Sequence, residues 1–417
     1  MKDCLVLLTK IYPFDKGEEF IENEVPLLAA AFEKVIIIST STADKPIQTR
    51  KTPENVSIYH ISASKIKKGL PFAAASLFPF TGFKGYCGAE EREALGHSFK
   101  KRMYLAYFIA KSDLVYDETV KILNNCELEQ YQSVTFYSYW FYDVALVALR
   151  LKKCCGAALK RAVCRAHGYD LYPYRNSANY LPLRSYILKY IDTVYPCSQN
   201  GSNFLSGLYP GYSDKIQTAY LGTNDCGLSP EKEGNMLHIV SCCHIVPVKR
   251  VELLAQALEK LKDSGLKLKW THFGGGDGLE ALKKFAEESL TFMECHFAGE
   301  VKNTELMQYY QNNHVDLFVN TSSSEGLPVS IMEACSFGIP GIATDVGGTG
   351  EIIRDGETGY LLNADVTSDE LAEKIRFAAL LPSEKIQELR TNCRSLWKKE
   401  FCAEQNFAQF AQNIKPL

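Results

Sequence analysis

Short apolar segments alternate with amphipathic helical segments along most of this 417-residue chain. In the C-terminal half the apolar segments include 237–241, 268–273, 315–320 and 341–344, and helical patterns separate them. This alternation through short loops is typical of a parallel sheet covered by helices on both faces. The sequence therefore predicts an α/β fold built from Rossmann-like units.

The N-terminal half shows the same alternation, with a helix expected at 18–31, and the chain is too long for one hydrophobic core. Glycine, asparagine, serine and proline cluster at 222–234, where we place a hinge. We predict an N-terminal domain at 1–222, a C-terminal domain at 223–385, and helices at 386–417 that return to the N-terminal domain. Residues 63–112 do not fit the alternation and are interpreted as an insertion in the first domain.

Composition narrows the class of protein. With 46% hydrophobic and 23% charged residues, the chain is globular. No apolar run reaches the roughly 18 residues that span a bilayer, and the first apolar segment predicts a buried strand rather than a signal peptide. The 14 cysteines form no C-x-x-C pattern. They predict reduced thiols in a cytosolic protein, not a zinc site or a disulfide framework.

Charge is unevenly distributed. Residues 1–217 carry 27 Lys and Arg against 21 Asp and Glu, and the remainder carries 19 against 28. A basic N-terminal half suggests an anionic partner, either a phospholipid surface or a pyrophosphate-linked acceptor, and ordinary surface variation is the alternative. We expect no nucleic-acid partner.

The most informative stretch is 324–334, which holds Glu325 in a loop after an expected strand and Glu333 on the helix that follows. Pro328 suits the first helical position. The start of such a helix presents free backbone N–H groups and a positive dipole end, which suits a diphosphate. Glu325 can hold sugar hydroxyls beside it, and Glu333 can reach a ribose. The alternative is two surface glutamates near a helix start.

This stretch resembles glycosyltransferase family 4, the retaining group with GT-B architecture, whose hallmark is two glutamates with the spacing of Glu325 and Glu333. The resemblance extends over nearly all of 216–362. It implies two Rossmann-like domains that face a central crevice, with the acceptor side in the first domain and the nucleotide-sugar site in the second. The further segments that match the family are 338–340, 345–348, 351–353, 355–356 and 359–362.

The resemblance also implies roles for individual residues. Glu325 contacts the donor sugar and Glu333 the ribose, and both His167 and Glu325 are candidate catalytic residues. Lys249 takes the place of the family's lysine that neutralises the diphosphate, while His244 stands where an arginine is usual and Arg250 is a candidate replacement. The remaining candidates line the donor or face the acceptor: Leu327, Val329, Ser330, Gly275, Gly276 and, in the first domain, Gly17.

Several alternatives stay open. His167 is either a donor-sugar contact or a core histidine, Lys249 is either a phosphate ligand or an ordinary helix-start lysine, and we expect His244 to be packed rather than a ligand. The chain contains no Asp-x-Asp motif, so we expect no metal cofactor and a UDP- or GDP-sugar co-substrate. An epimerase of the same fold and a non-catalytic sugar-nucleotide-binding protein are the competing functions. A hydride-transfer enzyme is disfavoured because no G-x-G-x-x-G follows the first strand.

The insertion suggests a membrane contact. It combines basic clusters with apolar segments, and a lipid-linked or glycan acceptor in surface polysaccharide synthesis would be met at the inner face of the cell membrane. The alternative is that its apolar residues are core. The residues concerned are Lys65, Lys67, Lys68, Phe72, Leu77, Phe78, Phe80, Lys100, Lys101, Arg102, Tyr104, Tyr107 and Phe108.

Overall fold

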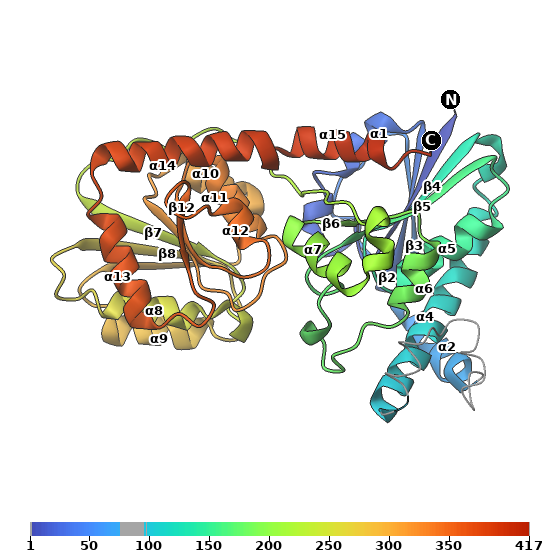
Figure 1. The fold of residues 1–417 in the computed structure, drawn as a ribbon, viewed down its shortest axis with the longest axis horizontal. Coiled ribbons are helices and arrows are strands. Elements are labelled where there is room, and N and C mark those ends of the chain that lie inside the picture. The colour runs from blue at the N-terminus through green and yellow to red at the C-terminus, as the bar shows by residue number, and fades with distance from the viewer. Residues whose placement is uncertain (1, 76–95, 97, 417) are drawn as a thin grey trace. The chain divides into compact units, whose positions relative to one another are not determined.

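The computed structural model describes residues 2–75, 96 and 98–416. The chain forms two compact units, which we call unit 1 (Met1–Tyr220 with Ala403–Leu417) and unit 2 (Leu221–Cys402). Each unit is a parallel six-stranded sheet with helices on its faces (Figure 1). The prediction of two Rossmann-like α/β domains is confirmed.

Unit 1 has the strand order β3-β2-β1-β4-β5-β6. Strand β1 (Asp3–Thr9), one of the two central strands, is buried along its whole length, as expected when helices cover both faces of a parallel sheet. The strands are β1 (Asp3–Thr9), β2 (Lys34–Thr42), β3 (Val56–Ser62), β4 (Ser133–Ser138), β5 (Leu159–Ala166) and β6 (Thr193–Pro196). The helices are α1 (Val25–Ala31), α2 (Ala63–Ala75), α4 (Phe99–Leu123), α5 (Asp143–Cys154), α6 (Arg184–Tyr190), α7 (Gln199–Leu208) and α15 (Ala403–Asn413).

Unit 2 has the strand order β12-β11-β10-β7-β8-β9. Helices α8, α9 and α13 lie on one face of this sheet, and α10, α11, α12 and α14 lie on the other (Figure 1). The strands are β7 (Met236–Cys242), β8 (Lys267–Phe273), β9 (Glu294–Gly299), β10 (Leu317–Asn320), β11 (Gly341–Thr344) and β12 (Gly359–Leu362). The helices are α8 (Val251–Glu259), α9 (Leu279–Ser289), α10 (Asn303–Asn312), α11 (Val329–Ser336), α12 (Thr349–Ile352), α13 (Ser368–Ala379) and α14 (Ser383–Leu396).

The C-terminal return to unit 1 begins later than the expected residue 386. Helix α14 and the π-helical turn Trp397–Phe401 stay with unit 2, where the indole N–H of Trp397 donates to Thr223 Oγ1 at 2.7 Å. Only α15 packs on unit 1, against α1. The reason is burial: Leu389, Cys393 and Trp397 are apolar side chains that unit 2 covers almost completely.

The insertion at 63–112 is more regular than its sequence indicates. Helices α2 and α4 pack on each other, and the described part of the insertion places Ile66, Leu105, Phe108 and Ile109 in the core of unit 1. Phe108 is therefore a core residue, in edge-to-face contact with Tyr142, and not a membrane-facing one. The expectations for Leu77, Phe78 and Phe80 fall at 76–95, which with 97 lies outside the described residues, as does the side chain of Phe72.

Within the described residues, no helix combines the length and the apolar character that crossing a bilayer requires.

Candidate functional site

The predicted donor-site residues of unit 2 follow the carboxyl ends of neighbouring strands. Lys249 comes after β7, the loop 274–278 after β8, Glu325 after β10 and the loop 345–348 after β11. Because parallel strands all end at the same edge of a sheet, these segments meet there, which is the position where open α/β sheets bind ligands. The structure thus brings together residues that the sequence separates by up to about a hundred positions.

Glu325 is only 6% exposed, yet it is not packed in an apolar environment. Its Oε1 accepts hydrogen bonds from Lys249 Nζ at 2.6 Å, Ser322 Oγ at 2.6 Å and Asn320 Nδ2 at 3.3 Å. A buried carboxylate is tolerated when such partners replace its lost hydration. The loop therefore holds the carboxylate in one position.

The loop after β11 clasps the backbone beside Glu325. Gly348 N–H donates to Gly326 O at 2.7 Å, and Gly347 has φ 58°. A Cβ atom added at Gly347 would lie 2.1 Å from Glu325 O, so only glycine permits this approach. The Asp345–Gly348 segment, which the sequence offers only as a family match, thus has a physical role in supporting Glu325.

The two basic residues after β7 differ in their contacts. Lys249 pairs with Glu325. Arg250 has left-handed backbone geometry (φ 47°), and its guanidinium donates to Thr321 O at 2.7 Å and Ser322 O at 3.2 Å. Arg250 therefore braces the loop that carries Glu325. His244 has a side chain 65% exposed, so the expectation of a packed histidine is wrong; its Nε2 lies 3.7 Å from Glu300 Oε1.

The glycine loop after β8 packs tightly against the loop after β7. Gly275 O accepts a hydrogen bond from Ile245 N–H at 2.8 Å. Gly276 has φ 127°, and a Cβ atom there would lie 2.8 Å from Ile245 O. The two loops therefore approach each other too closely for side chains at these positions.

Helix α11 carries the second glutamate. Pro328 is its N-cap rather than its first helical residue, and Val329 and Ser330 occupy the first turn, where backbone N–H groups lack partners within the helix. Leu327 is buried just before the cap. Glu333 is 8% exposed, and burial raises its pKa to about 7 despite a 2.6 Å hydrogen bond from Asn303 Nδ2.

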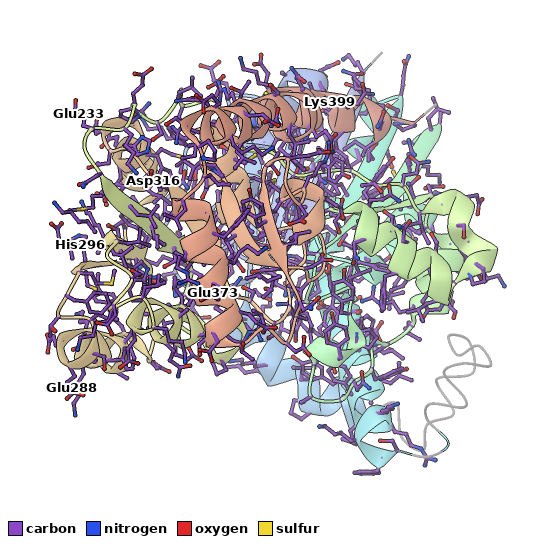
Figure 2. All side chains as sticks on the ribbon, turned by 60° about the vertical axis from the view of Figure 1, so that its left-hand side comes forward. Glu233, Glu288, His296, Asp316, Glu373 and Lys399 are labelled. Atoms are coloured by element: carbon purple, nitrogen blue, oxygen red, sulfur yellow. The ribbon has the colours of Figure 1, made fainter. Side chains whose placement is uncertain are left out.

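Asn303 is a site residue that the sequence analysis missed. It lies at the start of α10, thirty positions before its partner, and no motif links the two segments. By contrast, Glu288, Glu373 and Lys399 of unit 2 are exposed, and Figure 2 shows Glu288 pointing outward. Glu325 and Glu333 are, with Asp316, the buried carboxylates among the described residues of this unit, and acidic side chains are seldom buried without partners.

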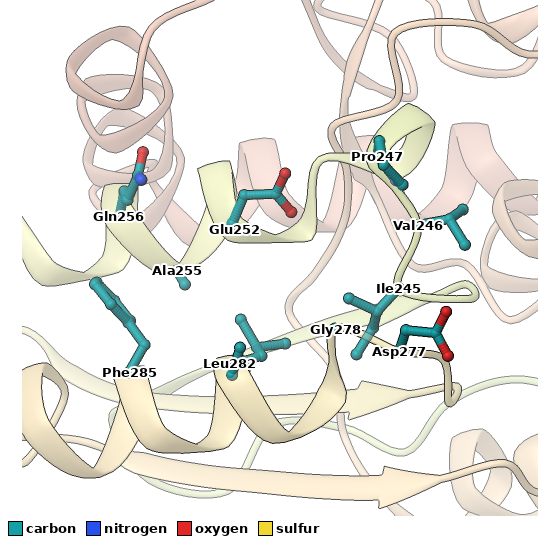
Figure 3. Close-up of a pocket in the computed structure, with 11 residues that line it drawn as sticks. Ile245, Val246, Pro247, Glu252, Ala255, Gln256, Asp277, Gly278, Leu282 and Phe285 are labelled. Atoms are coloured by element: carbon teal, nitrogen blue, oxygen red, sulfur yellow. The ribbon is translucent and has the colours of Figure 1, made fainter.

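A cavity of about 630 Å³ lies beside this edge of the sheet, between α8 and α9 (Figure 3). It is lined by Ile245, Pro247, Glu252, Asp277 and Phe285, among others. None of the predicted donor-binding residues lines it. The space immediately around Lys249 and Asn320 is much smaller, about 10 Å³. We therefore assign the site from its hydrogen bonds and charges and not from cavity size.

In unit 1, His167 follows β5 and is tightly held. Its ring Nε2 lies 3.2 Å from Tyr139 O, and its backbone N–H donates to Asp170 Oδ1 at 2.6 Å. A carbonyl oxygen only accepts, so Nε2 carries the proton and Nδ1 is free of one in the neutral ring. Burial lowers the pKa of His167 to about 4, outweighing the opposing effect of Asp170. The imidazole is therefore neutral at physiological pH.

Aromatic rings surround His167. Its ring centroid lies 4.9 Å from those of Tyr139 and Trp140 and 5.8 Å from that of Phe20. Gly17, the other candidate of unit 1, has φ 124° and donates its N–H to Glu19 Oε1 at 2.6 Å. The loop containing Gly17 and the wall around His167 both follow carboxyl ends of strands in the sheet of unit 1.

Among the side chains that the structure describes, no three His, Cys, Asp or Glu residues gather in a way that could hold a metal ion.

Two parallel six-stranded sheets, each covered by helices, are the architecture of the GT-B class of α/β proteins. Residues 229–396 match the family described as "Glycosyl transferases group 1". The match lies within unit 2 and includes both glutamates and Lys249.

Curated relatives carry names from polysaccharide synthesis. The chain is 39% identical over 130 residues to the O-antigen biosynthesis glycosyltransferase WbnH of Escherichia coli, which covers 30% of this chain and 33% of that protein. It is 22% identical over 260 residues to the putative colanic acid biosynthesis glycosyltransferase WcaL of Salmonella typhimurium, covering 60% and 63%. The chain thus spans a third of the length of the first relative and under two thirds of the second.

Solved structures share the whole fold. HepE from Anabaena, in complex with UDP and glucose, superimposes with a TM-score of 0.66 at 16% identity over 98% of both chains. Sucrose-phosphate synthase from Thermosynechococcus elongatus gives a TM-score of 0.68 at 16% identity over 99% of this chain and 98% of that one. At this identity the likeness supports the fold.

Proposed function

We propose that this protein is a retaining glycosyltransferase that moves a sugar from a UDP- or GDP-sugar to a glycan or lipid-linked acceptor in surface polysaccharide biosynthesis. The observation that carries the proposal is the Glu325–Lys249 ion pair at the carboxyl edge of the sheet, followed by the helix that holds the buried Glu333, within the region that matches group 1 glycosyl transferases. Relatives named for O-antigen and colanic acid synthesis support the process. The UDP bound to a structural neighbour supports the class of donor.

The contacts suggest a division of roles within unit 2. Lys249 supplies positive charge to the diphosphate, and first-turn amides of α11 at Val329 and Ser330 add donors. Glu333 accepts hydrogen bonds from the ribose hydroxyls. The backbone at Gly275 and Gly276 approaches the nucleotide. Arg250 acts indirectly, because its guanidinium holds the loop that carries Glu325.

We infer that Glu325 and His167 support the chemical step. As the donor's bond to its diphosphate breaks, the leaving group gains negative charge that Lys249 and the helix amides can stabilise without a metal ion. The neutral His167 offers Nδ1 as a hydrogen-bond acceptor for a sugar hydroxyl. Glu325 orients donor hydroxyls. Retention of configuration and metal independence are part of this proposal.

Two experiments test the proposed function. A thermal-shift screen with UDP-, GDP-, ADP- and CMP-sugars identifies the donor, because a specific ligand raises the melting temperature by mass action. Release of nucleoside diphosphate from that donor is then measured with and without bacterial lipid extract as acceptor, with and without EDTA. The proposal expects acceptor-stimulated release that EDTA leaves unchanged. Epimerised sugar without an acceptor would indicate the epimerase, and tight binding without any turnover would indicate a sensor.

We also propose that the protein works in the cytoplasm at the inner face of the cell membrane, on an anionic lipid surface. Phe99, Met103 and Tyr107 are 69%, 43% and 45% exposed and recur every four residues, so they share one face of α4. Lys100 on the same turn is exposed, as are Lys67 and Lys68 on α2. Exposed apolar groups flanked by cations suit an anionic bilayer surface.

Liposome co-sedimentation tests the membrane proposal. Binding should require anionic lipid, weaken with salt, and fall when Lys67, Lys68, Lys100 and Lys101 are replaced by Glu. A matched variant replaces the lysines Lys262, Lys284, Lys374 and Lys398 of unit 2 and should bind as the wild type does. A folded wild-type protein that ignores anionic liposomes at low salt would exclude the proposal.

A further inference from the structure

The carboxylate of Glu18 occupies a pocket of N–H groups in unit 1. Its Oε2 accepts hydrogen bonds from the backbone N–H groups of Ile11 at 2.7 Å and Tyr12 at 2.8 Å. Its Oε1 accepts a hydrogen bond from the backbone N–H of Lys10 at 3.0 Å. The indole N–H of Trp140 also donates to Oε1. Successive backbone N–H groups that converge on one point form an anion-binding nest. Here the anion is a side chain of the protein itself.

Glu18 is held in this position at a conformational cost. The sequence predicts a helix over 18–31, but Glu18 has left-handed geometry (φ 56°, ψ 34°), and the helix begins only at Val25 after a short 3-10 turn. Left-handed geometry is uncommon for a residue with a long side chain. Glu18 is nevertheless buried, with only 7% of the residue exposed. The hydrogen bonds to the nest therefore outweigh the helical propensity of this segment.

Trp140 connects this carboxylate to the other polar groups of the site. Its ring centroid lies 4.9 Å from that of His167, and the ammonium of Lys10 lies 4.4 Å from the Trp140 ring centroid. Lys10 also lies 5.4 Å from the ring centroid of Tyr169. The indole is thus fixed at its N–H by Glu18, while its ring contacts the imidazole at a tilt of 54° and lies under the cation.

We propose that Glu18 is a positioning residue of the transfer reaction, whose carboxylate fixes the indole of Trp140 and through it the ring of His167 and the ammonium of Lys10. This inference rests on the proposed function. Glu18 itself contacts no substrate, because its oxygens are engaged by the nest. Its effect on turnover passes through Trp140, which no sequence motif marks as part of the site.

The structural consequence is tested by tryptophan fluorescence. The chain has three tryptophans, and Trp270 and Trp397 are fully buried in unit 2. Subtracting the spectrum of Trp140→Phe from the wild type isolates the emission of Trp140. The same subtraction in a Glu18→Ala background should show Trp140 emission shifted to longer wavelength, because the freed indole gains contact with water.

The functional consequence is tested by chemical rescue. Glu18→Ala empties the nest and should lower the release of UDP from UDP-glucose, or of the diphosphate from the donor that the screen selects, at least tenfold in kcat. Its KM for the donor and its affinity for free nucleotide should stay within twofold of wild type. Acetate, a free carboxylate, should restore part of the lost kcat and the Trp140 emission, as a structural defect elsewhere would not.

Glu18→Gln and Glu22→Gln complete the design. Gln keeps the shape of Glu18 but presents an amide NH2 to N–H donors, so it should lower kcat without any rescue by acetate. Glu22 is an exposed carboxylate in the same turn, and Glu22→Gln should match the wild type. If Glu18→Ala does not fold, Glu18→Gln carries the kinetic and fluorescence test.

Wild-type kcat and unshifted Trp140 emission in both Glu18 variants would overturn the proposal, as would a loss of kcat that follows the melting temperature and ignores acetate. If the wild type releases nucleotide from no donor, the proposed function fails instead. The response of Trp140 emission to acetate then still decides whether Glu18 positions the indole.

Discussion

The ammonium of Lys249 lies 2.6 Å from Oε1 of Glu325, and the two residues neutralise each other within the proposed donor site of unit 2. Each is predicted to serve a different part of the donor, Lys249 the diphosphate and Glu325 the sugar. A bound diphosphate would compete with Glu325 for the same cation. The ion pair therefore balances the charge of the buried Glu325 carboxylate when no donor is bound. Lys249 should contribute to binding of the diphosphate and little to binding of the nucleoside.

Lys249→Met should separate the contribution of the diphosphate to binding from that of the nucleoside. It removes the cation, so affinity for the nucleoside diphosphate should fall by about 1.5–3 kcal/mol, the range for hydrogen bonds to charged groups. Affinity for the corresponding nucleoside should change little. Calorimetry with both ligands measures the difference, and Lys262→Met, at an exposed lysine of unit 2, is the control. Equal losses for nucleoside and diphosphate would contradict the phosphate role.

Glu333 predicts a pH dependence of nucleotide binding. Burial raises its pKa to about 7 in the free protein. Ribose hydroxyls donate to the carboxylate, so they favour its charged form, and affinity should rise with pH toward a plateau above pH 7. Glu333→Gln should remove this dependence. Glu333→Ala should weaken binding by about 1.5–3 kcal/mol. A wild-type affinity that is constant from pH 6 to 8 would refute the assignment.

The same residue predicts an opposite effect on stability. The folded-state pKa of Glu333 is raised above its unfolded value, so its contribution to stability is present at low pH and is lost as pH rises through about 7. Glu333→Gln should therefore stabilise the ligand-free protein at pH 8, by on the order of 1–3 kcal/mol. Denaturant unfolding at pH 5 and pH 8 compares the variants. A stabilisation that is equal at both values would rule out ionisation as its cause.

The sequence predicts well which residues of unit 2 meet at the carboxyl edge of its sheet, because strand order and motif agree there. Lys249 and Glu325 each follow a strand, and parallel strands bring their carboxyl ends to one edge whatever their separation in sequence. The hydrogen bond from Asn303 to Glu333 could not be predicted, since it depends on how α10 and α11 pack on the sheet. The role of Arg250 as a brace depends likewise on a left-handed residue that no sequence pattern indicates.

In unit 1 the sequence is more ambiguous. The helical pattern over 18–31 hid the left-handed Glu18, because its hydrogen bonds to the nest override local propensity. Basic and aromatic residues at 99–108 fit both a membrane-facing helix and a core helix. Packing against Tyr142 places Phe108 in the core, whereas Phe99, Met103 and Tyr107 on the same helix are exposed. Periodicity alone does not distinguish these cases.

His167 should affect turnover more than donor affinity. His167→Ala should lower kcat while nucleotide affinity stays within a few-fold of wild type, if its contact strengthens in the transition state. Because its pKa is about 4, His167 should contribute no inflection to the pH–rate profile between pH 5 and 8. His296→Ala, at an exposed histidine of unit 2, is the control. Full activity in His167→Ala would make it a core histidine.

Glu325→Gln gives the parallel test in unit 2. The amide retains the shape of the side chain but loses the charge that Lys249 and Ser322 stabilise. We expect kcat to fall much more than affinity for the intact donor, and a donor lacking the sugar should bind nearly as to wild type. Equal losses in rate and binding would make Glu325 a ground-state ligand only.

Gly347 lies in the loop that contacts the backbone beside Glu325, and it contacts no ligand in the proposed site. A Cβ atom at Gly347 would lie 2.1 Å from Glu325 O, so Gly347→Ala must displace the loop that carries Glu325. Gly356 has a similar left-handed backbone, φ 75°, but a Cβ atom there meets nothing within 4 Å. Gly356→Ala therefore isolates the cost of backbone strain, about 1 kcal/mol. Gly347→Ala should lower kcat at least tenfold beyond Gly356→Ala at matched melting temperatures. Equal activities in the two variants would show that this loop contact does not control Glu325.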